Sequence, residues 1–385
     1  VANGGSTNDG TPIISGTAEP GTTVTLFDDN IFIGQVTVGA DGHWGFIPST
    51  PLVEGNHYIT TQVTDAAGNT SALSPVFVLE VDTGAPLEAT NIQVYDDRAP
   101  SVGYIVSGDA TNDNTPTLSG RSEADAVITI YDGNNVIGTT QANGLGLWSF
   151  TPTAVLSDGP HSLTTTVTDG AGNTSSKSPP FTLTVDTTPP AVIASMTITA
   201  DTGVLVPGGS TKDTTLTVSG NSEPNSIVNL YDSDGKTLLG TVTAGPSGSW
   251  SVAIAPLGEG SHSITATATD ALGDTSVASP PAVVVIDLSA PAQMGAITVT
   301  DNKQPSTGVI HADDRINDNL PTLSGRAEAY STVNIYDGLT LVATTQTDAN
   351  GNWSVTPTAP LGDKSYTLTA TATDAAGNTS VASPG

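Results

Sequence analysis

The sequence predicts an all-β protein built as a tandem array of four β-sandwich domains. Three observations predict this fold class. One pattern recurs at the spacing of a small domain, apolar and polar residues alternate as in half-buried strands, and the composition favours strands and turns, with 41 Gly and 26 Pro among 385 residues. No apolar run approaches the length of a membrane span, so we expect no membrane insertion in this chain.

The repeat is clearest in the segment TDAAGN, which occurs at 64–69 and 373–378, with the variants TDGAGN at 168–173 and TDALGD at 269–274. Successive copies lie 104, 101 and 104 residues apart. This period exceeds the 20–50 residues of solenoid repeats and matches a complete small domain. Three sets of residues recur at about this spacing, and one of them contains all four tryptophans of the chain. The sets are Asp65, Asp169, Asp270 and Asp374; Trp44, Trp148, Trp250 and Trp353; and Glu19, Glu123, Glu223 and Glu328.

The predicted domain edges lie where an Asp follows the last apolar strand and a Pro follows soon after, in VDTGAP (81–86), VDTTPP (185–190) and IDLSAP (286–291). They divide the chain into modules 1 to 4, at 1–82, 83–186, 187–287 and 288–385. Module 1 lacks a counterpart of Ile92 and Val94, and module 4 stops where its last strand should begin. Both end modules look truncated, so we expect each to fray or to borrow a strand from a neighbour in a longer protein.

Each complete module is expected to contain seven strands, A to G. In module 2, Ile128 and Ile130 flank Thr129, and Leu163 to Val167 alternate in the same way, which marks half-buried strands. Seven short strands with turn signals about every ten residues are typical of an immunoglobulin-like sandwich. The strands of module 2 are predicted at 91–95, 117–121, 127–131, 136–141, 147–150, 161–168 and 180–185.

The strongly acidic charge limits the partners. Against 38 Asp and Glu there are 9 Lys and Arg, a formal charge of −29. Such a surface argues against nucleic acid and anionic membranes, because binding to phosphate depends on Lys and Arg. Self-repulsion would also loosen contacts between modules unless cations screen or bind the charge. The chain has no cysteine, and we expect a monomer whose modules contact their neighbours in the same chain.

The placement of the loops predicts a calcium site at each junction between modules. The F–G loop, which carries TDAAGN, and the B–C loop, which carries the repeated Glu, lie at one pole, and this pole faces the linker Asp of the module before. Ca²⁺ takes six to eight oxygen ligands, whereas transition metals prefer His or Cys clusters, which are missing. The expected ligands are Asp82, Glu123, Asp169 and Asn173 at the first junction, Asp186, Glu223, Asp270 and Asp274 at the second, and Asp287, Glu328, Asp374 and Asn378 at the third.

The same loops have a simpler interpretation, since Asp, Asn and Gly often stabilise turns through their own backbone and bind nothing. Three acidic segments converging in so acidic a chain favour calcium. With two aspartates in its F–G loop, the second junction should bind calcium most tightly of the three.

A second acidic cluster is expected at the opposite pole, in the A–B segment. A further ion there and a solvated acidic loop are equally supported. In module 3 this segment carries Lys212 beside Asp213, so we expect the poorest site there. The residues of the cluster are Asp96, Asp97, Asp109, Asn112 and Asp113 near Asp132 in module 2, and Asp301, Asp313, Asp314, Asn317 and Asp318 near Asp337 in module 4.

Other residues that could carry chemistry have structural interpretations. The tryptophans begin strand E and are expected in the core or capping a pole, and not as a ligand platform. His57, His161 and His262 begin strand F, where module 4 has Tyr366, which suggests a packing role and no metal ligation or general base. DSDG at 232–235 is expected to be a hairpin turn, since an EF-hand would need a downstream Glu and flanking helices. No nucleophile elbow or metalloprotease motif is present, and we expect no enzyme.

The segments TPTLSGRSE, NWSVTPTAPL and TDAAGNTS, the last before a VDTTPP-type linker, resemble the bacterial Ig-like repeats of giant adhesins. The resemblance covers the whole chain, although TDALGD departs from the usual Asn. It implies export by type I secretion, a place at the bacterial cell surface, and a role in adhesion, biofilm formation and virulence. It also implies a long stalk stiffened by calcium at its junctions, with a host cell or abiotic surface contacted by regions outside this chain.

Two functions therefore stand as hypotheses. The first is a calcium-rigidified extracellular spacer that projects a distal binding region. The second is an Ig-like module that itself binds a host or matrix glycan or protein. A glycan site would need an exposed aromatic cluster in one module, whereas the aromatic residues, 5% of the chain, lie mostly at repeated positions. The sequence favours the spacer.

Overall fold

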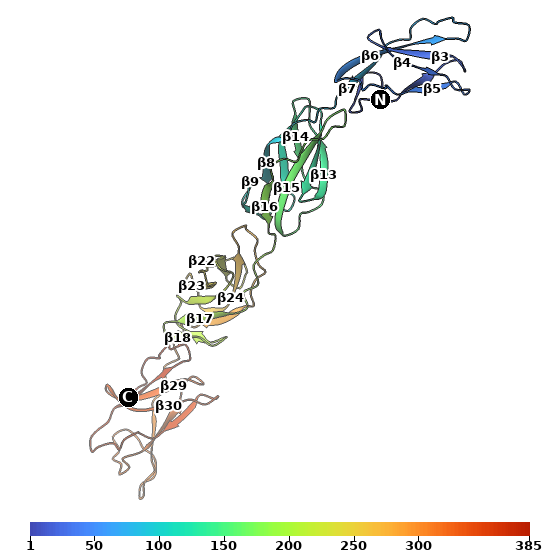
Figure 1. Ribbon diagram of the computed structural model, residues 1–385. Helices are drawn as coiled ribbons and strands as arrows, with labels where there is room; N and C mark the ends of the chain where they lie inside the picture. Colours follow the sequence, from blue (N-terminus) through green and yellow to red (C-terminus); the bar gives the residue numbers. More distant parts are fainter. The chain divides into compact units, whose positions relative to one another are not determined.

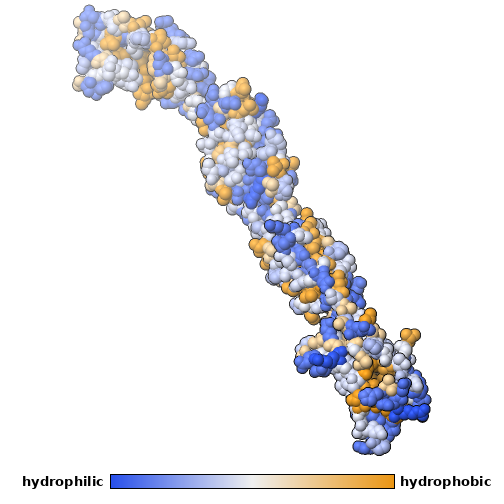
Figure 2. Space-filling model, turned by 180° about the vertical axis from the view of Figure 1, so that it is seen from behind, coloured by the Kyte–Doolittle hydropathy of each residue, from blue (hydrophilic) through white to orange (hydrophobic).

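The computed structural model describes residues 1–385 and contains strands β1 to β32 and no helix (Figure 1). The chain divides into two compact units, Val1–Thr188 and Pro189–Gly385, and each unit contains two modules. The predicted all-β fold of tandem sandwich domains is confirmed. The face shown in Figure 2 mixes polar and apolar residues on every module. No helix with the length and apolar character of a membrane span is present.

Module 2 shows the architecture of a complete module. One sheet has the order β14-β11-β8-β9 and the other β10-β16-β15-β12-β13, so strands A, B and E face strands G, F, C and D. The alternation of apolar and polar residues in these strands directs one face of each sheet into a shared core. The strands are β8 (Thr90–Asp96), β9 (Gly103–Ile105), β10 (Ala110–Thr111), β11 (Thr117–Arg121), β12 (Val127–Asp132), β13 (Asn135–Gln141), β14 (Leu147–Phe150), β15 (Gly159–Thr168) and β16 (Phe181–Val185).

Two of these strands, β9 and β10, were not expected. Both lie in the A–B segment, and β10 runs parallel to β16, with Thr111 opposite Val185. Strand A is thus hydrogen-bonded in one sheet, while the segment that follows it crosses to the edge of the other. Strands of two or three residues are too short to give a periodic pattern, which is why the alternation of residues does not reveal them.

Module 3 repeats this arrangement, with sheets β18-β17-β20-β23 and β19-β25-β24-β21-β22. Its strands are β17 (Met196–Ala200), β18 (Gly203–Val204), β19 (Ser210–Thr211), β20 (Thr217–Asn221), β21 (Ile227–Tyr231), β22 (Leu238–Thr243), β23 (Ser249–Ala253), β24 (Gly260–Thr269) and β25 (Ala282–Ile286).

The end modules each contain two strands fewer than module 2. Module 1 has no counterpart of β8 and β9, and module 4 has no counterpart of β10 and β16. Module 1 contains β1 (Gly5–Thr7), β2 (Ile14–Thr17), β3 (Thr23–Asp28), β4 (Ile31–Thr37), β5 (His43–Phe46), β6 (Gly55–Thr64) and β7 (Phe77–Val81). Module 4 contains β26 (Thr298–Asp301), β27 (Gly308–Val309), β28 (Thr322–Arg326), β29 (Thr332–Asp337), β30 (Thr340–Gln346), β31 (Asn352–Val355) and β32 (Leu368–Thr373).

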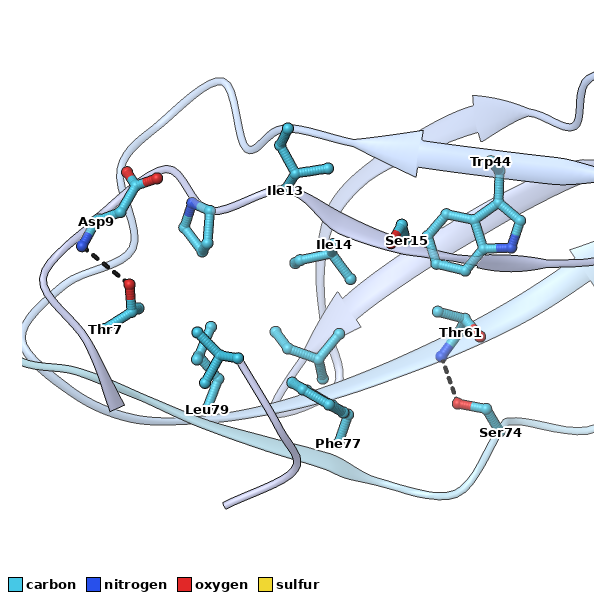
Figure 3. Close-up of a pocket in the computed structure, with 13 residues that line it drawn as sticks. Thr7, Asp9, Ile13, Ile14, Ser15, Trp44, Thr61, Ser74, Phe77 and Leu79 are labelled. Atoms are coloured by element: carbon cyan, nitrogen blue, oxygen red, sulfur yellow. Dashed lines mark hydrogen bonds between the residues drawn. The ribbon is translucent and has the colours of Figure 1, made fainter. Parts of the chain in front are cut away.

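The missing strand leaves a cavity of about 490 Å³ in module 1, shown in Figure 3. It is lined by Ile14 of β2 and Trp44 of β5 from one sheet, and by Ile59 and Leu79 from the other. In module 2 the side chain of Val94, on β8, is completely buried between the two sheets. The cavity therefore belongs to the incomplete sandwich, because no apolar side chain from a strand A fills this space.

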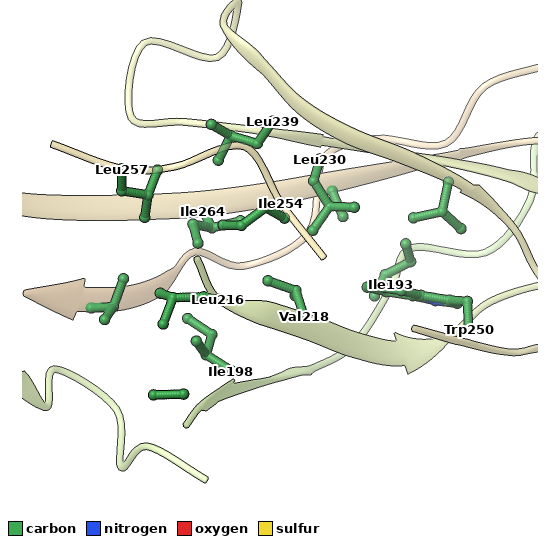
Figure 4. Packing of buried hydrophobic residues seen from close by; sticks show 14 of the residues in the cluster. Ile193, Ile198, Leu216, Val218, Leu230, Leu239, Trp250, Ile254, Leu257 and Ile264 are labelled. Atoms are coloured by element: carbon green, nitrogen blue, oxygen red, sulfur yellow. The ribbon is translucent and has the colours of Figure 1, made fainter. Parts of the chain in front are cut away.

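A complete module buries a continuous apolar core, shown for module 3 in Figure 4. Trp250 lies beside Ile193 at one end of the cluster, and all three tryptophans of modules 2 to 4 are about 95% buried. This confirms the predicted core position of the tryptophans. A Cβ added to Gly120 would lie 2.6 Å from the ring of Trp148, and Gly220 has the same relation to Trp250. The Gly at the end of strand B and the Trp of strand E therefore recur together because only Gly leaves room for the indole ring.

Candidate functional site

The F–G loop is held by its first Asp. In module 2 the Oδ1 atom of Asp169 accepts the backbone N–H groups of Ala171, Gly172 and Asn173 at 2.8–2.9 Å, and its Oδ2 accepts the Asn173 amide at 2.9 Å. Asp65 and Asn69 make the corresponding bonds in module 1, which no module precedes in this chain. Turn chemistry thus accounts for the recurrence of the loop, as the simpler interpretation predicted.

The Asn of the loop also connects two modules. Asn173 Nδ2 donates to the backbone oxygen of the linker residue Asp82 at 2.8 Å. In the second unit, Asn378 Nδ2 donates to the backbone oxygen of Asp287 at 2.7 Å. The structure therefore brings together three of the four residues predicted at the first junction, Asp82, Asp169 and Asn173, and three of the four at the third, Asp287, Asp374 and Asn378.

The repeated glutamates stand apart from these sets. Glu123 and Glu328 are exposed, and nowhere do three or more Asp, Glu or His side chains lie close enough together to hold a metal. The backbone oxygens of Glu223 and Glu328 each accept the N–H of the Ser three residues later, a turn contact that makes no use of the carboxylate. Any cation at a junction would thus depend on carbonyl and amide oxygens as well as carboxylates.

The residues predicted at the second junction are divided between the two units. In the first unit, Asp186 accepts the N–H of Thr188 at 3.1 Å. In the second, Asp270 Oδ1 accepts the N–H groups of Leu272, Gly273 and Asp274 at 2.8–2.9 Å. The F–G loop of module 3 is thus built like the others, with Asp274 where Asn173 and Asn378 stand.

Each linker is bound by an acidic residue of the E–F loop that the sequence analysis missed. Glu54 accepts the Thr83 N–H at 3.0 Å and its hydroxyl at 2.7 Å, and these bonds, led by the N–H, lower the pKa of Glu54. Asp158 accepts the N–H and hydroxyl of Thr187 and the hydroxyl of Thr188, and the hydroxyl of Thr188 contributes most to the lowered pKa of Asp158. In module 3, Glu259 accepts the Ser289 hydroxyl at 2.7 Å. The available signal was the acidic residue three positions before each strand-F histidine, in EGNH, DGPH and EGSH.

The strand-F histidines form polar clamps, which is more specific than the packing role that the sequence suggested. His57 Nδ1 lies 2.5 Å from Asp28 Oδ2, and Nε2 lies 2.7 Å from the Val53 carbonyl. Burial disfavours the charged ring, but the bonds to the Val53 carbonyl and the Asp28 carboxylate outweigh it and raise the pKa of His57.

The clamp recurs in the next two modules. His161 contacts Asp132 and the Ser157 carbonyl, and His262 contacts Asp232 and the Gly258 carbonyl. For both histidines the same balance of burial against these bonds raises the pKa. The carboxylate of Asp132, which the sequence predicts near the A–B cluster, is bound by His161 and by the N–H of Ser162.

The A–B segment of module 2 contains buried carboxylates. Asp96 and Asp113 are each 3% exposed, and the Thr111 hydroxyl donates to Asp96 Oδ2 at 2.5 Å. Asp113 accepts the N–H groups of Asp97 and Thr115. The sequence therefore identified the cluster but not its burial, which makes the charges on Asp96 and Asp113 costly unless they are compensated.

The corresponding segments of modules 3 and 4 differ from this arrangement. Asp301 is 1% exposed, and its Oδ2 atom has no hydrogen-bond partner, because Ile316 stands where module 2 has Thr111. Its neighbour Asp318 is also buried and accepts the N–H groups of Asn302 and Leu320. In module 3 the residue that corresponds to Asp96 is Ala200, as the strand register shows.

Comparison with known proteins identifies the family of the chain. Among solved structures, the chain is similar to a Ca²⁺-stabilised adhesin with which an Antarctic bacterium binds ice (26% identity over 98% of this chain and 93% of that one, TM-score 0.41). It is also similar to a tetra-tandem repeat from the extending region of a large adhesion protein (23% identity, 99% and 97% coverage, TM-score 0.33). No curated protein sequence matches the chain. The model of the bacterial Ig-like domain matches residues 2–83, 96–187, 188–288 and 293–385, and the chain therefore belongs to the bacterial Ig-like domain family.

Proposed function

We propose that this chain is a segment of the extracellular stalk of a large bacterial adhesin, a spacer that projects a distal binding region. The observation that carries the proposal is the repeated attachment of the linkers. Asn173 and Asn378 bind the linker backbone from the module that follows, and Glu54, Asp158 and Glu259 bind the linker residues from the module before. Contacts on both sides of a linker restrict the hinge, which a spacer needs and an isolated binding module does not.

The proposal includes calcium as the ion that stiffens the stalk. The buried, unpartnered Oδ2 of Asp301 fits a cation ligand, and Ca²⁺ suits the carboxylate, amide and carbonyl oxygens at the module ends. When bound, the ion would supply positive charge to an acidic surface. At the first junction we propose Asp82, Asp169 and Asn173 with the exposed Glu123. At the third we propose Asp287, Asp374 and Asn378 with the exposed Glu328. In the A–B segments we propose Asp96, Asp97 and Asp113, and Asp301 with Asp318.

The structure supports a ranking of the A–B sites. Asp301 has an uncompensated buried oxygen, Asp96 already has a hydroxyl donor, and module 3 has Ala200 at this position. Module 4 should therefore bind calcium most readily in this segment and module 3 least. We leave Asp132 out of these sites because His161 holds its carboxylate.

The cellular location of the protein follows from the same proposal. It is exported by type I secretion, stays at the bacterial surface, and serves attachment, biofilm formation and virulence through regions outside these 385 residues. The proposal assigns no catalytic activity to the chain.

The test is small-angle scattering of the whole chain in millimolar Ca²⁺ and in chelator. Strands of six to eight residues at about 3.3 Å per residue, with their loops, make each module roughly 40 Å long and four modules on the order of 150 Å. We expect a rod of that length with calcium and a flexible chain of folded modules without it. The same maximum dimension and flexibility in both buffers would refute calcium stiffening.

A second candidate function, glycan binding, has one observation in its favour. Tyr104 of module 2 is 66% exposed and packs edge-on against Tyr95, with ring centroids 5.2 Å apart. The two rings are inclined at 77°, so they form no single flat platform, and the spacer remains the better supported function. Retention of the chain on a glycan array, abolished by Tyr104→Ala, would favour this alternative.

A further inference from the structure

Each of the three linkers is connected to a strand-F histidine through one short loop. In module 1, His57 Nε2 is hydrogen-bonded to the carbonyl of Val53, and the next residue, Glu54, accepts hydrogen bonds from Thr83 of the linker. The order of contacts is the same in the other two modules that are followed by a linker. In module 2, His161 is hydrogen-bonded to the Ser157 carbonyl, and Asp158 accepts hydrogen bonds from Thr187 and Thr188. In module 3, His262 is hydrogen-bonded to the Gly258 carbonyl, and Glu259 accepts a hydrogen bond from Ser289.

The partners of these rings define their protonation state. A carboxylate and a backbone carbonyl can only accept hydrogen bonds, so a ring that donates to both must carry a proton on each nitrogen. His57 is 5% exposed and His161 8% exposed, so water cannot easily replace either partner. When the ring is neutral, one of its two nitrogens becomes an acceptor facing another acceptor, and one of the two bonds must break.

We propose that the clamps formed by these three histidines depend on protonation and determine how firmly each linker is bound. With the ring charged, the E–F loop is fixed to the C–D turn, and its acidic residue is positioned to bind the linker. With the ring neutral, the loop is released and the hold on Thr83, Thr187 and Ser289 weakens. The proton-dependent clamp is inferred from contacts within single modules and their linkers. That it controls the stiffness of a stalk rests on the proposed function.

Module 4 shows how the same position is filled without histidine. Tyr366 donates its hydroxyl to the Gly362 carbonyl at 3.1 Å, and Lys364 Nζ lies 2.6 Å from Asp337. Two side chains thus perform the two tasks of one imidazolium, and the bond to Asp337 raises the pKa of Lys364 further above neutrality. The clamp of module 4 should therefore keep its charge across the range in which the histidines titrate.

The charged groups around the rings mostly favour the protonated state. His57 faces Asp28 and Asp29 of the C–D turn, and His262 faces Asp232. His161 faces Asp132, and Lys177 donates to the Gly133 carbonyl of the same turn. Because the folded pKa is raised, the contribution to stability is complete below the pKa of an unfolded histidine, about 6.5, and is lost as the pH rises through the folded pKa.

The test is an NMR titration of the whole chain in chelator from pH 5.5 to 9.5. We expect the midpoints of His57, His161 and His262 to lie above the pKa of an unfolded histidine, about 6.5. Each full unit of difference corresponds to a tenfold loss of the closed clamp on deprotonation. The Thr83 and Thr187 amide protons, which donate to Glu54 and Asp158, should shift with the midpoints of His57 and His161.

Two variants provide the controls. His57→Tyr introduces only the tyrosine of module 4, and it should abolish the pH-dependent shift of the Thr83 amide while leaving that of Thr187 unchanged. If this variant does not fold, Asp28→Asn should move the His57 midpoint, and the Thr83 shift with it, toward the value of an unfolded histidine, about 6.5. Midpoints at about 6.5 would overturn the proposal, and so would raised midpoints with linker amides that do not move. Because calcium is absent, a failure of calcium stiffening would leave the result intact.

Discussion

Asp169→Ala separates the two roles of the F–G loop, because Asp65→Ala is a matched control. Both aspartates accept backbone N–H bonds and the side-chain amide of the Asn four residues on. Only Asp169 also supports a residue that reaches a preceding linker, since Asn173 donates to the Asp82 carbonyl. The two substitutions should therefore have similar effects on the loop and different effects on the junction.

The magnitude follows from the hydrogen bonds. Asp169 accepts four hydrogen bonds within its loop. The loop is partly exposed, so water replaces much of what is lost, and we expect each substitution to lower the stability of its module by about 1–2 kcal/mol. Both modules should stay folded, because their cores contain no F–G loop residue. Calcium affinity and junction stiffness should fall only for Asp169→Ala.

The assay is hydrogen exchange of the whole chain in increasing denaturant, which gives a free energy for each module, together with calcium titration by calorimetry. Equal calcium binding by the two variants would refute the role of Asp169 as a ligand at the first junction. No loss of stability in either variant would refute the reasoning about the turn. Unfolding of module 2 alone would show that the loop stabilises far more than its hydrogen bonds account for.

Three further predictions concern the stability of single modules, each measured by the same hydrogen exchange. Trp148→Ala should cost about 3–5 kcal/mol in module 2 as a large core deletion, and a loss below 1 kcal/mol would contradict the packing of its ring over Gly120. Ser178→Ala should cost about 1–3 kcal/mol, because its hydroxyl accepts the buried Thr165 N–H, whereas the control Ser176→Ala should change little. In chelator, Ile316→Thr should stabilise module 4 by about 1 kcal/mol by giving Asp301 Oδ2 the donor that Thr111 gives Asp96; an unchanged free energy would show that Asp301 is already compensated.

Part of the candidate site could be predicted because it is local. The bonds of Asp169 to the residues two to four positions later, and the positions of Asp96 and Asp113 near one pole, follow from turn chemistry and strand order. The histidine clamp could not be predicted in this way, since His57 and Asp28 are 29 residues apart and their contact depends on the pairing of β3 with β6. The contact of Glu54 with Thr83 spans the same separation and was missed for the same reason.

The sequence by itself determined the number of modules, the seven main strands of a complete module, and the core positions of Trp148 and its counterparts, because period and alternation are properties of the chain alone. Only the tertiary structure decided which polar groups meet. It placed Glu123 in solvent, joined Asp132 to His161, and left the Oδ2 atom of Asp301 buried without a donor. The physical reason is that a hydrogen bond requires its partners within about 3 Å, and a pattern that fixes the face and the pole of a side chain does not fix its neighbour to that accuracy.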